Sequence, residues 1–213
     1  MRRFVKALRD NSLSIVLFAL FVASIGGAVW SGWLHQSETL AAHHRGGMAL
    51  GSYLGSATFI DGLAVNWQAA ILQLASLVVF SSFLYQRGSP HSRKPDRHSQ
   101  GRRRRKPGYV PSWVRRNSLF IAFALLFVVS FCLHAVGGAA ASNSERALMS
   151  EPPMTLGDYL VSSKFWWQNF QTWQAEYLVI ALYLVLSVFL RQKGSAESKP
   201  EDAPDGQTGE HNE

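Results

Sequence analysis

The fold is decided by an uncharged stretch in the middle of the chain, Leu119–Ala141, which reads LFIAFALLFVVSFCLHAVGGAAA. At a rise of about 1.5 Å per residue, a helix of this length spans the ~30 Å hydrocarbon core of a bilayer. Backbone groups in lipid must satisfy one another, so the stretch is predicted to be a transmembrane helix.

Three further apolar runs surround this stretch, and the sequence therefore predicts an all-α membrane protein with four transmembrane helices. Charged residues make up only 16% of the chain and lie mostly between the runs. A soluble enzyme would carry about a quarter of charged residues, spread over its surface. The single cysteine, Cys132, excludes an intramolecular disulfide and a CxxC redox site. The three runs are Leu13–Trp33, Trp67–Tyr85 and Trp173–Leu190.

The sequence repeats itself at an offset of 106 residues. When positions 11–92 are laid on 117–198 without a gap, 30 of the 82 pairs are identical. Shared apolar composition does not explain the matching polar motifs, Trp-Gln-Ala at 67 and 173 and Gln-x-Gly-Ser at 86 and 192. The first apolar run is then the counterpart of an internal helix, which argues against a cleaved signal peptide.

Each repeat contains two helices, so both repeats enter the membrane from the same side. The sequence predicts two tandem helical hairpins, a parallel internal repeat about an axis along the membrane normal. The predicted segments are a basic N-terminus (1–11), a first unit (12–86, spans 13–33 and 67–85), a disordered basic linker (87–116), a second unit (117–192, spans 119–141 and 173–190) and a disordered tail (193–213).

Basic residues fall on one side of the predicted topology. Of the 21 Lys and Arg, 18 lie in the N-terminus, the linker and the tail, and 3 lie in the other two loops. The positive-inside rule then predicts a multi-pass protein of the cell membrane with both termini in the cytoplasm.

The linker carries a dense run of basic residues, which a cytoplasmic position of the linker is enough to explain. Arg102, Arg103, Arg104, Arg105 and Lys106 are also expected to attract anionic lipid headgroups. No aromatic residues interleave the arginines, so binding of nucleic acid is not expected.

The two outer loops share the pattern G-x-Y-L-x-S-x-x-F, at 51–59 and 157–165. An aromatic and apolar stripe beside polar residues predicts a short helix lying in the membrane interface. Thr155 and Asp158 have the spacing of a capping box at the start of the second copy. These helices either anchor the bundle or cover an outward-facing cavity.

Polar candidates within or beside the spans are few: Gln73, His134 and Glu176. Glu176 is expected to reach the outer water near Lys164 or Gln174, because it lies one turn from the predicted boundary. The counterparts of His134 and Glu176 in the first unit are alanines, so no symmetric pair forms. A haem would need a second axial ligand, for which His35 is the nearest candidate.

The first helix carries small residues at four-residue intervals, Ala23-x-x-x-Gly27-x-x-x-Ser31. Such spacing lets helix backbones approach closely, either within the chain or between copies. A homo-oligomer is therefore left open.

No catalytic set is visible, so no enzyme activity and no cofactor or metal are expected. The first hypothesis is a structural or accessory membrane protein that binds a partner or lipid. The alternative is a small transporter or channel, in which a dimer is an option, with Gln73, His134 and Glu176 lining its path. A membrane enzyme or haem carrier has the least support.

The two helix-entry and helix-exit motifs resemble a family of uncharacterised bacterial integral membrane proteins, known only as a domain of unknown function. Its unit has N-W-Q-S-E before the second helix and Q-x-G-S-x-E-S-K-P after it. Here Asn66-Trp67-Gln68 matches in the first copy, and Trp173-Gln174, Glu176 and the stretch 192–200 match in the second. The departures are Ala70 and Thr172. The resemblance implies the membrane architecture and brings no activity.

The topology leads to a labelling prediction. Cysteines placed at Ser99 and at Ser142, in a chain without Cys132, should react with an impermeant thiol reagent from opposite sides of the membrane. Labelling of both positions from outside intact cells would contradict the predicted orientation.

Overall fold

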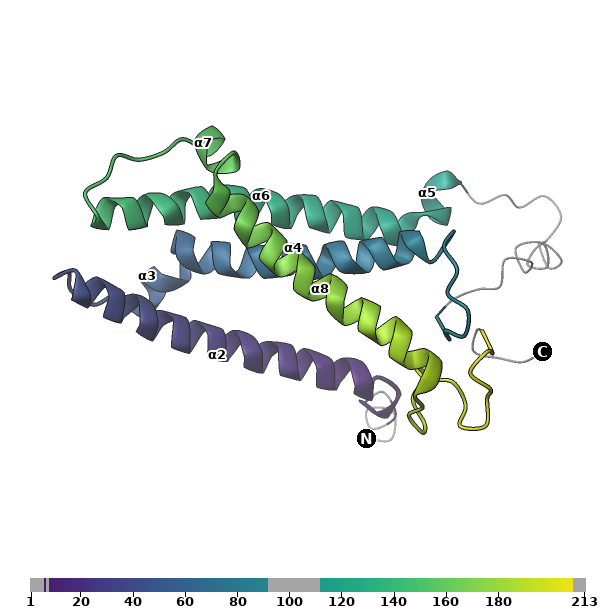
Figure 1. Ribbon diagram of the computed structural model, residues 1–213. Helices are drawn as coiled ribbons and strands as arrows, with labels where there is room; N and C mark the ends of the chain where they lie inside the picture. The colour runs from purple at the N-terminus through teal and green to yellow at the C-terminus, as the bar shows by residue number, and fades with distance from the viewer. Residues whose placement is uncertain (1–5, 7, 92–111, 209–213) are drawn as a thin grey trace.

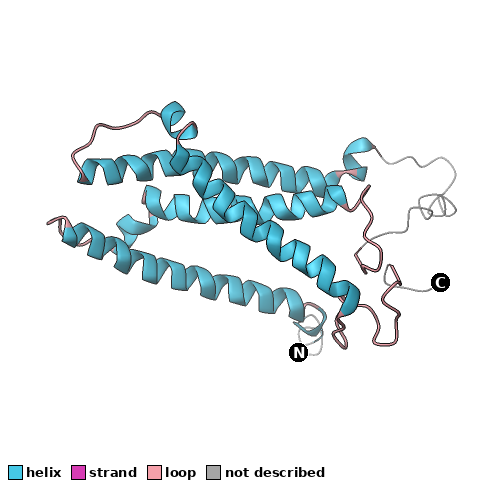
Figure 2. Ribbon diagram, viewed as in Figure 1, coloured by secondary structure: helices cyan, strands magenta, loops and turns pink. Residues whose placement is uncertain are grey.

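The computed structural model describes residues 6, 8–91 and 112–208, and within them every regular element is a helix (Figures 1 and 2). Four long helices are apolar enough to cross a membrane, which confirms the predicted fold class. Each extends past the predicted apolar run at one end or both, because polar residues continue the helix. The four are α2 (Ser12–Ala42), α4 (Ala57–Phe80), α6 (Ser118–Leu148) and α8 (Ser163–Phe189).

Short helices precede the second long helix of each half, where the sequence predicts them. They are α3 (Leu50–Leu54) and α7 (Leu156–Leu160), and a further short helix, α5 (Trp113–Arg116), precedes α6. In α7 the predicted capping box forms between Thr155 and Asp158. The hydrogen bonds from Thr155 lower the pKa of the Asp158 carboxyl.

Matching serines start the second long helix of each half. The Ser56 hydroxyl accepts the backbone N–H of Phe59, and the Ser162 hydroxyl accepts that of Phe165, both at 3.2 Å. Each serine thereby satisfies one of the free N–H groups at a helix start. The Ser56 cap places the beginning of α4 ten residues before Trp67, so that residues 57–66, with Asp61 among them, belong to the helix.

The antiparallel helices α4 and α6 lie side by side and form the centre of the molecule, and α8 crosses α4 diagonally (Figure 1). Two glycines of α6 allow the close approach. A Cβ on Gly137 would lie 3.3 Å from the Asp61 backbone nitrogen, and one on Gly138 would collide with the Tyr159 hydroxyl group. Small residues at the contact let the two backbones come together.

The remaining long helix, α2, touches α4 where the Phe21 and Trp67 rings lie with centroids 6.3 Å apart, and it is otherwise largely exposed. It is tied to α3 through Tyr53, whose hydroxyl occupies the space beside Gly32. The Trp33 indole also donates a hydrogen bond of 2.6 Å to the Met48 carbonyl. None of the residues of α2 is buried.

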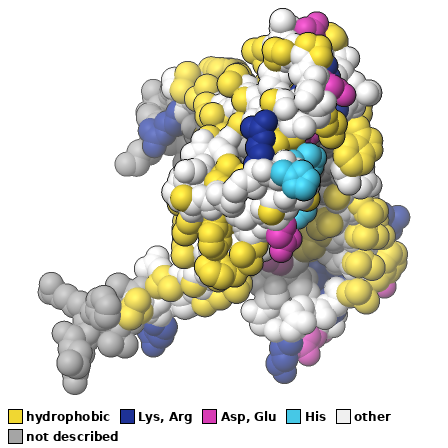
Figure 3. Space-filling model, turned by 90° about the vertical axis from the view of Figure 1, so that its left-hand side faces the viewer, with side chains coloured by type: hydrophobic (Ala, Val, Ile, Leu, Met, Phe, Trp, Pro, Cys, Tyr) yellow, Lys and Arg dark blue, Asp and Glu magenta, His cyan; other side chains and the backbone are white. Residues whose placement is uncertain are grey.

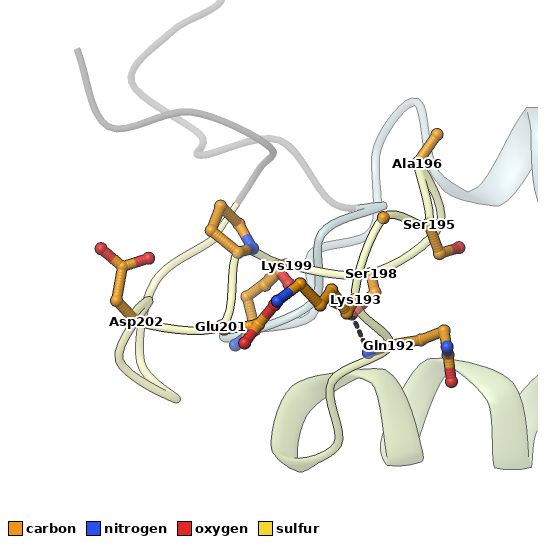
Figure 4. A pocket seen from close by; sticks show the side chains of 10 residues that line it. Gln192, Lys193, Ser195, Ala196, Ser198, Lys199, Glu201 and Asp202 are labelled. Atoms are coloured by element: carbon orange, nitrogen blue, oxygen red, sulfur yellow. Dashed lines mark hydrogen bonds and ion pairs between the residues drawn. The ribbon is translucent and has the colours of Figure 1, made fainter.

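The described part of the tail, residues 193–208, contains turns held by local hydrogen bonds. Lys199 is buried, and its ammonium donates to the Asp205 and Gln207 carbonyls, at 2.9 and 3.4 Å. Arg191 also pairs with Asp205 at 2.8 Å. The turns enclose a hollow beside residues 192–202, where the Gln192 N–H donates to the Ser198 hydroxyl (Figure 4). These local hydrogen bonds fold a polar sequence that has no apolar core of its own.

Residues 92–111 lie outside the described part of the chain, and the basic run at 102–106 lies within them. The flanking residues 87–91 and 112–116 are described. Of these, Gly88 donates its N–H to the Thr208 hydroxyl at 2.9 Å, so the linker start contacts the tail.

The glycine contact at α6 leads to a stability prediction. Gly138→Ala should destabilise the protein by about 1–3 kcal/mol, because the added methyl overpacks a site filled by the rigid Tyr159 ring. Gly62→Ala, on the exposed side of α4, is the matched control, since nothing lies within 4 Å of the Cβ it adds. Unfolding in detergent micelles measures both. Equal stability of the two variants would contradict the packing described for α6.

Candidate functional site: a buried polar network

A carboxylate and an imidazole meet between α4 and α6. The Nδ1–H of His134 donates to Asp61 Oδ1 across 2.6 Å. The His134 side chain is fully buried and that of Asp61 is only 11% exposed. An ionisable group so placed requires a partner, since an unpaired charge in an apolar interior is strongly destabilising.

Two amides extend this pair to the third helix. Asn169 of α8 donates its Nδ2 N–H to His134 Nε2 at 3.4 Å and to the Phe165 carbonyl at 2.8 Å. Its Oδ1 accepts from Gln68 Nε2 of α4 at 2.6 Å. We call Asp61, His134, Asn169 and Gln68 the polar network. It connects α4, α6 and α8 by hydrogen bonds between side chains.

Aromatic rings close the network toward α7. The Phe165 ring is stacked on His134, with centroids 5.0 Å apart, and meets Tyr159 edge to face. The Tyr159 hydroxyl donates to Gln168 Oε1 at 3.0 Å. Burial raises the pKa of the Tyr159 phenol, and the nearby charge of Asp61 adds to the effect, so the ring stays neutral.

One atom of the network lacks a partner among the described residues. Gln68 Oε1 is buried and accepts no hydrogen bond there, although Gln68 has no exposed surface. A buried orphan acceptor is destabilising by about 1–3 kcal/mol unless a water or another group reaches it. Gln68 Oε1 is therefore the one acceptor of the network that no described donor satisfies.

The three predicted polar candidates are not brought together. His134 lies in the network, whereas Gln73 donates its amide to the backbone carbonyl of Glu176 at 2.9 Å. The Glu176 carboxylate is partly exposed and contacts neither expected partner. Instead, Lys164 binds Glu145 at 2.5 Å, and Gln174 donates to the Gln171 carbonyl. Gln73 and Glu176 are thus neighbours through the backbone, away from His134.

Sequence reasoning missed Asp61, Gln68 and Asn169. Asp61 precedes the apolar run that begins at Trp67, and Gln68 belongs to the repeated Trp-Gln-Ala motif, so neither stands out as an ionisable or isolated polar residue within a span. One signal for Asp61 is present in the sequence, because Ser56 is a residue type that favours the position just before a helix. In a helix that begins there, Asp61 and Gln68 are seven residues apart and share one face.

A groove between α4 and α8 lies toward the tail and has a volume of about 430 Å³. Leucine and aromatic side chains form its walls. Hydroxyl, amide and imidazole groups lie among them, including the Ser76 and Tyr177 hydroxyls, which are 2.9 Å apart. The lining residues are Gln73, Ser76, Leu77, Phe80, Ser81, Leu84, Tyr85, Gln86, His91, Tyr177, Ile180 and Leu184.

The opposite end of the bundle looks different. Seen from the end where α2 and α6 finish, hydrophobic side chains cover the flanks, and charged and histidine side chains gather between them (Figure 3). Two ion pairs lie at the end of α6, Lys164 with Glu145 and Arg146 with Glu151, the second at 3.2 Å. Exposed pairs of this kind contribute little stability, and they suit a surface in contact with water.

The polar network can clamp helices and can hold a proton, but the described residues contain no cluster of three metal-ligating side chains. Both ring nitrogens of His134 are engaged, one by Asp61 and one by Asn169. His35, the distant candidate for a second axial ligand, is exposed on α2.

The described residues form an all-helical protein with four candidate membrane spans, three of which, α4, α6 and α8, are joined by buried polar side chains. The chain belongs to the family described as a domain of unknown function (DUF6766), whose family model matches residues 1–210. None of the curated proteins and none of the solved structures compared with the chain matches it significantly.

The polar network and Glu176 should differ in how much their mutation destabilises the protein. Asp61→Ala leaves His134 buried without its partner and should cost about 3 kcal/mol of unfolding free energy. Glu176→Gln is the control and should leave the free energy nearly unchanged, because its carboxylate is partly exposed. Unfolding of both variants in mixed micelles checks this. A larger loss for Glu176→Gln than for Asp61→Ala would reverse the assignment.

Proposed function

We propose that this chain is an accessory integral membrane protein that binds a phospholipid in the groove between α4 and α8. The observation that carries the proposal is the composition of that groove. Its walls offer Leu77, Phe80 and Leu184 to an acyl chain, and hydroxyl and amide groups accompany them. Lipid-binding sites combine a mostly apolar cavity with a few polar groups that fix orientation.

The polar end of the groove fits a lipid headgroup. Tyr85, Gln86 and His91 lie where α4 gives way to the linker, so they would stand at the membrane surface. The His91 ring meets the Tyr183 hydroxyl at 2.7 Å, which holds it at the groove. The basic run 102–106 follows within the same linker and would attract an anionic headgroup.

Transport is the second candidate, and the Asp61–His134 pair is the observation that favours it. Intramembrane ionisable groups often mark ion or proton paths. The expected path of Gln73, His134 and Glu176 is not supported, since these side chains do not meet in one cavity. The enclosure of His134 by Phe165 and Asn169 favours a structural role for the pair.

The proposal includes the predicted orientation, with both termini and the linker in the cytoplasm of the cell.

The proposal also includes the tandem duplication. Two local arrangements 106 residues apart support it: Tyr53 fills the space beside Gly32, and Tyr159 fills the space beside Gly138. In each half the tyrosine also packs against a phenylalanine, at centroid distances of 5.2 and 5.3 Å.

Lipid binding is tested by filling the groove. Leu184→Trp should displace the bound lipid, because the indole would occupy the space of the acyl chain. Purification from native membranes followed by native mass spectrometry measures the phospholipid retained. We expect an adduct on the unmodified protein and a large loss of it in the variant.

The matched control is Leu182→Trp, which changes an exposed residue of the same helix outside the groove. Its lipid adduct should equal that of the unmodified protein. Equal retention by both variants, or no adduct on the unmodified protein, would contradict the proposal.

A further inference from the structure

Helices α4 and α6 pack against each other within the chain. Their counterparts in the repeat, α8 and α2, leave the equivalent faces exposed. Helix α4 buries a stripe spaced three, four and seven residues apart: Asp61, Ala64, Gln68 and Ala75. Helix α6 lies along α4 and buries Ser130, His134 and Gly137. At its centre, the Asp61 backbone rests on Gly137.

The counterparts of the α4 stripe, 106 residues later, lie on α8 and are exposed. Trp167 stands in the place of Asp61 and is 63% exposed, and Phe170 stands in the place of Ala64 and is 58% exposed. The other two counterparts, Gln174 and Ala181, are exposed as well. Two large aromatic side chains on this stripe therefore remain more than half exposed in the single chain.

The counterparts of the α6 face lie on α2 and are also exposed. They are Ser24, Ala28 and Ser31, which replace Ser130, His134 and Gly137. Two neighbouring glycines, Gly26 and Gly27, have nothing within 4 Å of an added Cβ. Helix α2 thus presents a shallow, exposed surface of small side chains beside the contact that Phe21 makes with Trp67 of α4.

We propose that the α8 stripe of one copy packs on the small-residue face of α2 of a second copy, repeating the α4–α6 contact between chains. The partner is a second copy because the chain already makes a contact of this kind between its own α4 and α6. Each copy exposes both halves of the same kind of interface, so two copies satisfy each other by a twofold axis.

Size complementarity supports this pairing. In the α4–α6 contact, two polar side chains of intermediate size meet, Asp61 and His134. In the proposed contact a large side chain, Trp167, replaces the aspartate, and a small one, Ala28, replaces the histidine. Small residues on one membrane helix let a partner approach closely and pack on it by van der Waals contact.

Orientation is consistent with a membrane. Helices α4 and α6 run antiparallel, and α8 and α2 run in those same two directions (Figure 1). Two copies inserted the same way round therefore bring α8 against α2 antiparallel, with Trp167 and Ser31 at equal depth. A parallel α8–α2 contact would have required opposite insertion.

Cysteine cross-linking between differently tagged copies tests the interface. In a chain with Cys132→Ala, one copy carries Ser31→Cys and the other carries Trp167→Cys. Both positions are exposed in the single chain, so both variants should fold. After coexpression and mild oxidation in native membranes, we expect most of the two chains to run as a disulfide-linked heterodimer.

The control moves the first cysteine to Trp30, whose counterpart Val136 points away from α4 and is 59% exposed. Trp30→Cys with Trp167→Cys should give no heterodimer. A double variant carrying Ser31→Cys and Trp167→Cys in one chain tests whether the two positions meet within a single copy. Disulfide formation only within that single chain, or no cross-link in any combination, would overturn the proposal.

Discussion

The hydrogen bond between Asp61 and His134 is the interaction on which the arrangement of the helices depends. Burial of apolar side chains alone does not favour a helix contact over contact with lipid, because lipid tails are as apolar as leucine. A hydrogen bond of 2.6 Å between a buried carboxylate and a buried imidazole does favour one particular contact. Any rotation of α4 against α6 would separate these two polar groups, which are shielded from water. The pair therefore fixes the rotation of both helices and, through Asn169, that of α8.

The close approach of α4 and α6 depends in turn on small residues. Gly137 and Gly138 leave the space that the Asp61 backbone and the Tyr159 ring occupy. Tyr159 and Phe165 then shield the pair on the side of α7, which keeps His134 without exposed surface. The short helix α7 thus has a defined task, since it carries the ring that covers the network. The corresponding helix α3 carries Tyr53 to Gly32, where no ionisable pair exists.

The fold class followed from the sequence because apolar length is a property of single segments. The site did not, because it is made by residues from three segments that become neighbours only after packing. His134 was found as an ionisable residue in a span. Asp61 escaped because the helix was expected to start at Trp67, and the Ser56 cap starts it ten residues earlier. The backbone contact of Gln73 with Glu176 has no pattern in the sequence, since any residue supplies a carbonyl.

The direct test is a double-mutant cycle on Asp61 and His134. Asp61→Asn, His134→Gln and the double variant are unfolded in micelles, and their free energies are compared with that of the unmodified protein. If the two side chains act as one unit, the double variant loses less than the sum of the single losses, by about 1–3 kcal/mol. Strictly additive losses would mean that the two residues stabilise the bundle independently, and would contradict the central role of their contact.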